Sequence, residues 1–312
     1  KANRMWEKTS AEMIERGCPT DTIRLIVDSL NDYEPDVFIT SGHATERNWM
    51  PGYGYRNGAF KCKKGKLFGQ DTKGAVHYVD ALNPKVHLPV GNCLIAHIKD
   101  RECMALALMH SAGVYQMVGY TIPTGYGYGG WGVKDYFSEL QAGRFTLTEA
   151  HFANQIAMIY NLENLNQNVE QPSRRGGLRG DRDTVVMYGD PAWEARMKPR
   201  ELLWTQELKD KDGEYTFTVT CNDTGDWDNR PIVHFFAERL ADIEITEGGE
   251  YNVEIMDDFI LLKLNSGLYP MKGNRGEEIP IKGDFEKGEK FTIKFTAIKM
   301  SEKKTGTVPP GI

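Results

Sequence analysis

The sequence predicts a mixed α/β protein in which a mostly parallel sheet flanked by helices is followed by an all-β unit. Two observations lead to this prediction. Before residue 199, short apolar runs alternate with amphipathic segments, which is typical of parallel βαβ units. After it, segments such as EYTFTVTC and KFTIKFTAI are β-rich, separated by Gly, Asp and Asn, and show no helical pattern. We therefore predict two domains, 1–198 and 199–312, the second a small β-sandwich.

Spacing of the apolar residues predicts each element in turn. An apolar residue at every third or fourth position indicates a helix, and a short continuous apolar run indicates a strand buried on both faces. Phe152, Ile156, Ile159 and Tyr160 are expected to face inward from the last helix, capped by Thr148. The expected elements, in order, are helices 5–16 and 21–30, strand 37–40, loops and a surface ribbon over 44–85 with a hairpin at Lys64-Gly65, strand 86–90, helix 101–109, strand 114–119, a Gly-aromatic loop at 121–132, helices 133–141 and 148–163, a polar loop at 164–183 and strand 184–188.

Composition excludes several classes of protein. The chain of 312 residues is 40% hydrophobic, enough to bury a core, and holds no apolar run of about 18 residues, so we expect no membrane span. A net charge of -6 without a basic stripe argues against a nucleic-acid partner. Five cysteines, an odd number without CxxC spacing, exclude a disulfide scaffold. The start at Lys1 is typical of a processed or trimmed polypeptide, with any export signal removed.

A histidine and a cysteine follow two of the predicted strands. His43 comes after strand 37–40, and Cys93 comes after strand 86–90. Parallel strands that end together bring such residues to one edge of the sheet. A thiol beside an imidazole is the minimal apparatus for acyl transfer, because the imidazole takes up the thiol proton. The alternative interpretation is a small buried cysteine and an ordinary loop histidine.

These residues carry a resemblance to a known family. VFITSGHATERNW and VHLPVGNC resemble the strand-plus-His and strand-plus-Cys segments of the clan CD cysteine peptidases, which include caspases, legumains and gingipains. The resemblance is closest to gingipains: Trp49 lies shortly after the His, Trp131 lies in a later loop, and a further strand ends in YGDP. It implies a caspase-like catalytic domain followed by an immunoglobulin-like sandwich.

The resemblance also implies a mechanism. His43 is the general acid or base and Cys93 the nucleophile, so that the enzyme hydrolyses peptide bonds through a thioester, with no cofactor. The oxyanion hole uses the backbone N–H groups of Cys93 and of the residue after the His, here Ala44 where the family usually has Gly. The first strands of the family fold do not precede His43, so we expect a further N-terminal segment to supply them. The implied location is secreted, periplasmic or on the cell surface.

Aromatic residues near the two strand ends are candidates for the substrate pocket: Trp49, Tyr126, Tyr128 and Trp131. The loop 121–132 contains no carboxylate. Because burying an Arg or Lys without an opposing charge is costly, we expect the pocket to accept an uncharged or apolar side chain. Glu46 is the nearest acid in the sequence. The alternative interpretation is that these aromatics serve packing.

Three further interpretations stay open. The His and Cys residues at 87, 93, 97, 103 and 110 fit no structural zinc spacing, so we expect no catalytic metal. Asp223, Asp226 and Asp228 form a loop that suits a structural Ca²⁺, although it lacks the EF-hand pattern and reads more simply as a solvated turn. The alternative to a peptidase is a catalytically inactive secreted or cell-surface binding protein on the same scaffold.

Overall fold

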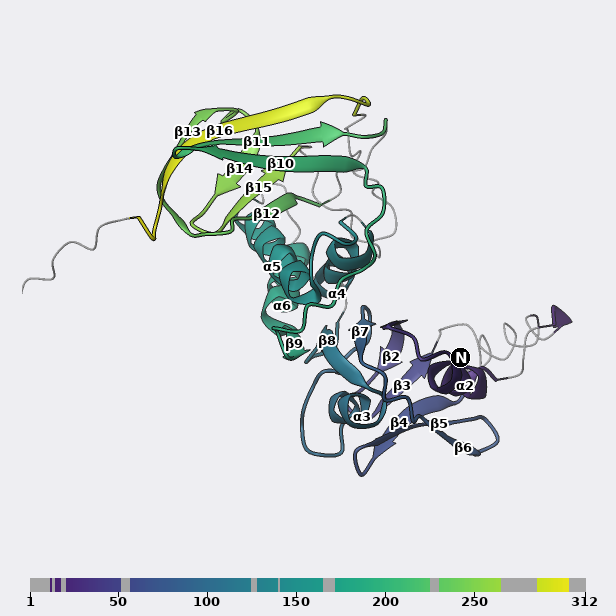
Figure 1. The fold of residues 1–312 in the computed structure, drawn as a ribbon. Coiled ribbons are helices and arrows are strands. Elements are labelled where there is room, and N and C mark those ends of the chain that lie inside the picture. Colours follow the sequence, from purple (N-terminus) through teal and green to yellow (C-terminus); the bar gives the residue numbers. More distant parts are fainter. Residues whose placement is uncertain are drawn as a thin grey trace, which may run out of the picture. The chain divides into compact units, whose positions relative to one another are not determined.

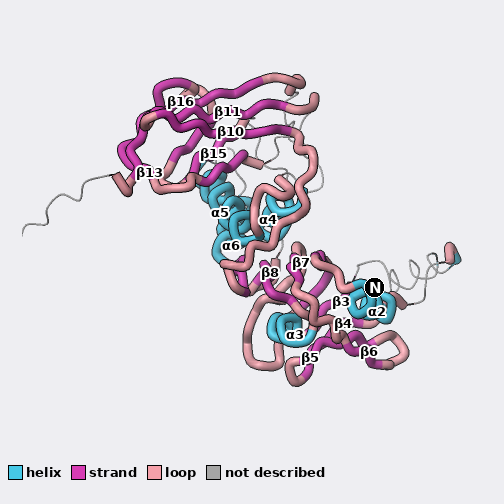
Figure 2. The backbone as a smooth tube through the Cα atoms, in the orientation of Figure 1, coloured by secondary structure: helices cyan, strands magenta, loops and turns pink. Residues whose placement is uncertain are grey.

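The fold is known from a computed structural model (Figures 1 and 2). It describes residues 12, 15–17, 21–51, 57–124, 128–139, 141–164, 172–224, 230–264 and 285–302. The chain divides into two compact units, Lys1–Pro199 and Arg200–Ile312. The mixed α/β class predicted from the sequence is confirmed.

A four-stranded sheet forms the centre of the first unit. Its strands are β1 (Val37–Thr40), β7 (Lys85–Pro89), β8 (Val114–Tyr120) and β9 (Val185–Gly189), in that order across the sheet. β1, β7 and β8 are parallel, whereas β9 runs antiparallel to β8. Every residue of β7 is buried, as expected for a strand covered on both faces. All four strands lie within a residue or two of the predicted ones.

A second, antiparallel sheet occupies the segment where the sequence predicted mainly loops. It contains β2 (Gly42–Ala44), β3 (Asn48–Pro51), β4 (Ala59–Lys63), β5 (Lys66–Gln70) and β6 (Val76–Tyr78), paired in chain order. These strands are only three to five residues long, so their alternation is too short to be distinguished from a loop. The predicted hairpin at Lys64-Gly65 is confirmed, with φ values of 50° and 71° at the two turn residues.

Helices cover both faces of the four-stranded sheet (Figure 1). On one side lies α3 (Met104–Ser111), which contacts β8 and the antiparallel sheet, and α2 (Ile23–Tyr33) packs on β5. On the other side lie α4 (Tyr128–Lys134), a π-helical turn η1 (Asp135–Glu139), α5 (Leu147–Asn164) and α6 (Pro172–Thr184). A continuous apolar core joins α2, α3, the antiparallel sheet and β8.

Two predictions about the later helices are wrong. The loop predicted at 164–183 contains helix α6, which begins at a proline, a residue that suits the first turn because its missing N–H has no intrahelical partner. The inward face predicted for α5 is also wrong, because Phe152 is 58% exposed and Ile159 is 41% exposed. The helix instead buries three large apolar residues, Leu147, Met158 and Leu162, together with a row of smaller residues: Ala150, Ala153, Asn154, Ala157 and Asn161. Small residues permit close packing that a hydrophobicity pattern does not record.

The cap of helix α5 also differs from the prediction. Thr146, rather than Thr148, is the capping residue: its Oγ1 accepts the backbone N–H of Glu149 at 3.1 Å, and the Glu149 carboxylate accepts the N–H of Thr146 at 2.7 Å. This reciprocal pair is a capping box. The Thr148 hydroxyl donates to the Pro191 carbonyl instead.

The second unit consists of two antiparallel sheets. The larger contains β10 (Trp204–Lys211), β11 (Glu214–Cys221), β16 (Lys290–Lys299) and β13 (Leu240–Glu247), and the smaller contains β12 (Ile232–Phe235), β15 (Phe259–Lys263) and β14 (Asn252–Ile255). The sheets face each other, with the rings of Phe217 and His234 5.5 Å apart. Alternate residues of β11 are buried, which explains the period-two pattern of its sequence. Within the part of the chain that the structure describes, no helix is long and apolar enough to cross a membrane.

Candidate active site

His43 lies where the chain passes from one sheet to the other. β1 ends at Thr40, and two residues later the chain enters β2, the edge strand of the antiparallel sheet. The turn depends on Gly42, whose φ of 117° is accessible to glycine and strained for other residues. His43 pairs with Met50 in the β2–β3 ladder, and both side chains are exposed on the same face. The imidazole is therefore presented to solvent at the end of β1.

Cys93 lies at the corresponding end of β7. Pro89 is the register partner of Thr40, and the N–H of Val90 donates to the Thr40 carbonyl at 3.0 Å. Three residues later, the Cys93 thiol is partly exposed and contacts Thr124 after β8: the sulfur accepts the Thr124 N–H at 3.3 Å and lies 3.6 Å from its carbonyl oxygen. The cysteine is thus held between the ends of β7 and β8.

The backbone just after Cys93 is in an uncommon conformation. Leu94 has a φ of 57°, in the left-handed region that a branched apolar residue rarely adopts. Its N–H donates to the Ile122 carbonyl at 3.2 Å, and the Ala96 N–H donates to the Tyr120 carbonyl at 3.0 Å. Strained residues persist where surrounding contacts hold them, and such positions cluster at functional sites.

The two candidate segments are joined directly by a side chain. Asn92 Nδ2 donates to the Gly42 carbonyl at 3.1 Å, so the residue before Cys93 is bonded to the residue before His43. Asn92 is fully buried. The structure therefore brings the predicted catalytic segments together at one edge of the parallel sheet.

The backbone donor expected at Ala44 is oriented away from the neighbouring strand. The Thr45 N–H donates to the Asn48 carbonyl at 2.8 Å. In an antiparallel ladder, alternate residues turn their N–H groups toward and away from the partner, so the Ala44 N–H is directed away from β3. Ala44 is 8% exposed, and its methyl group belongs to the core. The Ala44 methyl group therefore packs in the core, while its N–H is directed away from β3.

Trp131 lies beside the turn that carries Cys93. A Cβ placed on Gly91 would lie 3.9 Å from the Trp131 Nε1 and 2.9 Å from the Ser41 Oγ, so these two groups lie close to the Gly91 backbone. The indole is 40% exposed, and the Lys134 ammonium lies 5.4 Å from its ring centroid. Trp131 is thus the predicted aromatic whose exposed surface adjoins the candidate site.

Two other predicted pocket residues have structural partners. Trp49 is 6% exposed, stacks on Phe60 at 4.9 Å and donates its indole N–H to the Ser41 carbonyl at 2.9 Å, so it packs in the core rather than lining a pocket. The carboxylate of Glu46 lies 3.7 Å from the Lys99 ammonium. Tyr126 and the Tyr128 side chain lie outside the described residues.

A buried polar network behind the site was not predicted from the sequence. It consists of Thr40, His87 and Asn92, and His87 was the one member examined there, as a candidate metal ligand. The available signal was the presence of single polar residues within or next to the apolar runs VFIT and VHLPV. Buried polar groups normally have hydrogen-bond partners, but the sequence pattern does not identify which residues those partners are.

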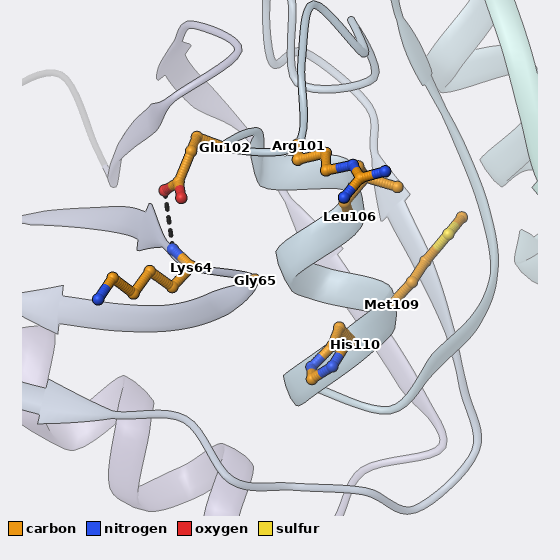
Figure 3. A pocket seen from close by; sticks show the side chains of 7 residues that line it. All are labelled: Lys64, Gly65, Arg101, Glu102, Leu106, Met109 and His110. Carbon is orange, nitrogen blue, oxygen red and sulfur yellow. Dashed lines mark hydrogen bonds between the residues drawn. The ribbon is translucent and has the colours of Figure 1, made fainter.

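A pocket of about 740 Å³ lies elsewhere on the first unit, between the Lys64-Gly65 turn and helix α3 (Figure 3). Glu102 accepts the backbone N–H of Lys64 at one side of this pocket. Its lining residues are Lys64, Gly65, Arg101, Glu102, Leu106, Met109 and His110. Neither His43 nor Cys93 belongs to this set, so the pocket is separate from the candidate active site.

Metal binding has no support from the described side chains. Among them, no group of three or more His, Cys, Asp or Glu residues is arranged to hold an ion. Of the predicted calcium loop, Asp226 and Asp228 lie outside the described residues, and the Asp223 carboxylate accepts the N–H of Thr224 at 2.9 Å.

Comparisons of the chain with protein-family models, with curated proteins and with solved structures find no match.

Proposed function

We propose that this protein is a cysteine peptidase in which His43 and Cys93 form the catalytic dyad. The observation that carries the proposal is the hydrogen bond from Asn92 to Gly42 at the ends of the parallel strands β1 and β7. It joins the two segments through the residues directly before the dyad. Because the thiol is partly exposed and the imidazole exposed, a peptide can reach both groups.

The proposed reaction is acyl transfer in two stages. His43 takes the proton of the Cys93 thiol, and the thiolate attacks the scissile carbonyl carbon. The N–H groups of Cys93 and Ala44 donate to the resulting oxyanion. The tetrahedral intermediate collapses to a thioester as His43 protonates the departing amine. His43 then takes a proton from water, and the hydroxide attacks the thioester carbonyl. The C–S bond breaks to release the acid, and His43 returns its proton to the Cys93 thiolate, which restores the thiol.

The substrate we propose carries an uncharged or apolar side chain next to the scissile bond. Three exposed apolar side chains flank the dyad: Met50 opposite His43, Ile122 beside the Cys93 turn, and Trp131 next to Gly91. The acid nearest in sequence, Glu46, already faces Lys99. A basic side chain would lack an opposing charge from that residue.

The proposed architecture is a caspase-like catalytic domain followed by an immunoglobulin-like domain. The parallel arrangement of β1, β7 and β8, with helices on both faces, supports the first assignment. The two antiparallel sheets of the second unit support the other.

Site-resolved alkylation of the thiols tests this function without knowledge of the substrate. We expect iodoacetamide at pH 7 to modify Cys93 at least about tenfold faster in the wild type than in the His43→Ala variant, because an imidazole that accepts the thiol proton makes the sulfur a better nucleophile. Cys62 is the internal control: burial raises the pKa of its thiol to about 11, so it should react slowly in both proteins.

The rival function makes a different prediction. A catalytically inactive binding protein would show equal alkylation of Cys93 in the wild type and in His43→Ala. A peptide library then completes the test: cleavage should disappear in Cys93→Ser and in His43→Ala. Dominant cleavage after Arg or Lys would contradict the apolar preference.

A further inference from the structure

A one-way chain of hydrogen bonds lies directly behind the proposed dyad. The Thr40 hydroxyl donates its only proton to Asn92 Oδ1 at 2.8 Å. Its oxygen, 3.0 Å from His87 Nε2, must therefore accept, which places the imidazole proton on Nε2. Asn92 Nδ2 then donates to the Gly42 carbonyl at 3.1 Å. The order of donation is His87, Thr40, Asn92, Gly42.

The chain is buried throughout. His87 is 1% exposed, Thr40 4% and Asn92 0%. His87 stacks on Phe38 with ring centroids 5.1 Å apart, and burial lowers its pKa to about 3, so it stays neutral near pH 7. At a buried site, each lost partner leaves a costly unsatisfied group, so the side chains are held in one arrangement.

The position of Asn92 gives this arrangement a consequence for the dyad. The bond from the Val90 N–H to the Thr40 carbonyl continues the pairing of β1 and β7 by one residue. Beyond it the two segments diverge, one into β2 and the antiparallel sheet, the other into the turn held by β8. The Asn92 side chain spans this divergence, one residue from His43 and Cys93 along each segment.

We propose that Asn92 is a positioning residue that sets the relative geometry of the Cys93 thiol and the His43 imidazole, and that Thr40 and His87 hold its amide in the required orientation. This inference rests on the proposed peptidase function. It assigns Asn92 no contact with substrate. Its effect is transmitted through the backbone of Gly42 and through its own peptide bond to Cys93.

The opposite end of the same strands supplies a matched control. Asn83 Nδ2 donates to the carbonyls of Glu34 at 2.7 Å and Pro35 at 3.1 Å. It therefore joins the chain before β7 to the chain before β1, as Asn92 joins the chain after them. Asn83→Ala removes a comparable side-chain bond at the edge of the sheet remote from the dyad.

The test is a double-mutant cycle on the alkylation rate of Cys93 between pH 5 and 9, with urea unfolding measured in parallel. We expect Asn92→Ala to lower the pH 7 rate about tenfold, toward that of His43→Ala, and the double variant Asn92→Ala/His43→Ala to match His43→Ala alone. Asn83→Ala should lower stability and leave the rate profile of the wild type unchanged.

A second pair of variants covers the case in which Asn92→Ala does not fold. Thr40→Val keeps the shape of the side chain and removes the hydroxyl that orients Asn92, so the Cys93 alkylation rate should fall. Thr40→Ser keeps the hydroxyl, so its rate should match that of the wild type. The positioning role is wrong if His43→Ala lowers the Cys93 alkylation rate by the same factor in the Asn92→Ala or Thr40→Val background as in the wild type. In that case the dyad still stands. If His43→Ala alkylates as fast as the wild type, the dyad itself is wrong, and the positioning role falls with it.

Discussion

Replacing His87 by Gln is expected to make the stability of the first unit less dependent on pH. His87 is fully buried, and this burial lowers its pKa from the usual 6.5 to about 3. Below pH 6.5 the unfolded chain takes up a proton at this position and the folded chain does not. Protonation therefore favours unfolding, and the stability that is present above pH 6.5 is lost progressively as the pH falls toward 3.

The size of the effect follows from the two pKa values. Each pH unit between them changes the free energy of unfolding by about 1.4 kcal/mol, so the wild type should lose about 2 kcal/mol from this residue between pH 7 and pH 5. Gln does not titrate, and its amide can donate to the Thr40 hydroxyl as the imidazole does. The difference between the two proteins then isolates the His87 contribution, because their other titrating groups are the same.

Two buried cysteines allow the assay to follow each unit separately. Cys103 belongs to the core of the first unit and Cys221 to the second unit. The full chain is equilibrated in urea at pH 7, 6 and 5, given a short pulse of a maleimide, and the labelled fraction of each cysteine is measured. Between pH 7 and pH 5, the free energy of unfolding measured at Cys103 should fall by about 2 kcal/mol more in the wild type than in His87→Gln. The free energy of unfolding measured at Cys221 should change by the same amount in both proteins. An equal pH response of Cys103 in the two proteins would refute the reasoning.

Thr146→Ala should destabilise the first unit by about 1 kcal/mol, because the hydroxyl that accepts the Glu149 N–H is lost, and Thr146→Ser should retain the stability of the wild type; Cys103 labelling in urea measures both. Trp49→Phe should cost about 1 kcal/mol for the lost bond to the Ser41 carbonyl. Trp131→Phe, at an exposed indole, should leave stability unchanged and raise KM for an apolar peptide. A loss of stability in Trp131→Phe together with unchanged stability in Trp49→Phe would contradict the assignment of Trp49 to the core and of Trp131 to the site.

Local patterns in the sequence were sufficient for the central sheet. VFIT and VHLP are continuous apolar runs, and such runs occur where a strand is covered on both faces, so β1 and β7 could be predicted with their ends. Because parallel strands end at one edge, the placement of His43 and Cys93 near each other along the sheet followed from the same observation. The change to a β-only unit after residue 199 could also be predicted from local patterns. Alternate residues of strands such as β11 are buried, and this burial produces a period-two pattern in the sequence.

The antiparallel sheet, helix α6 and the burial of Trp49 were decided by contacts between distant parts of the chain. A strand three residues long or an Arg/Gly-rich helix has little local signal, and it becomes stable only against the surface on which it packs. Whether a tryptophan faces the core or solvent likewise depends on its neighbours in space, here Phe60 and the Ser41 carbonyl.

Patterns in the sequence were enough to predict the mixed α/β class, the strand that precedes each catalytic candidate, and the chemical nature of the pair. How that pair is held became evident only in the fold: Thr40 bonds to residues 47 and 52 positions later in the chain, and Asn92 bonds to Gly42, 50 positions earlier. Hydrogen bonds need atoms aligned within about 3 Å, and a chain meets that condition across such separations only once it has folded.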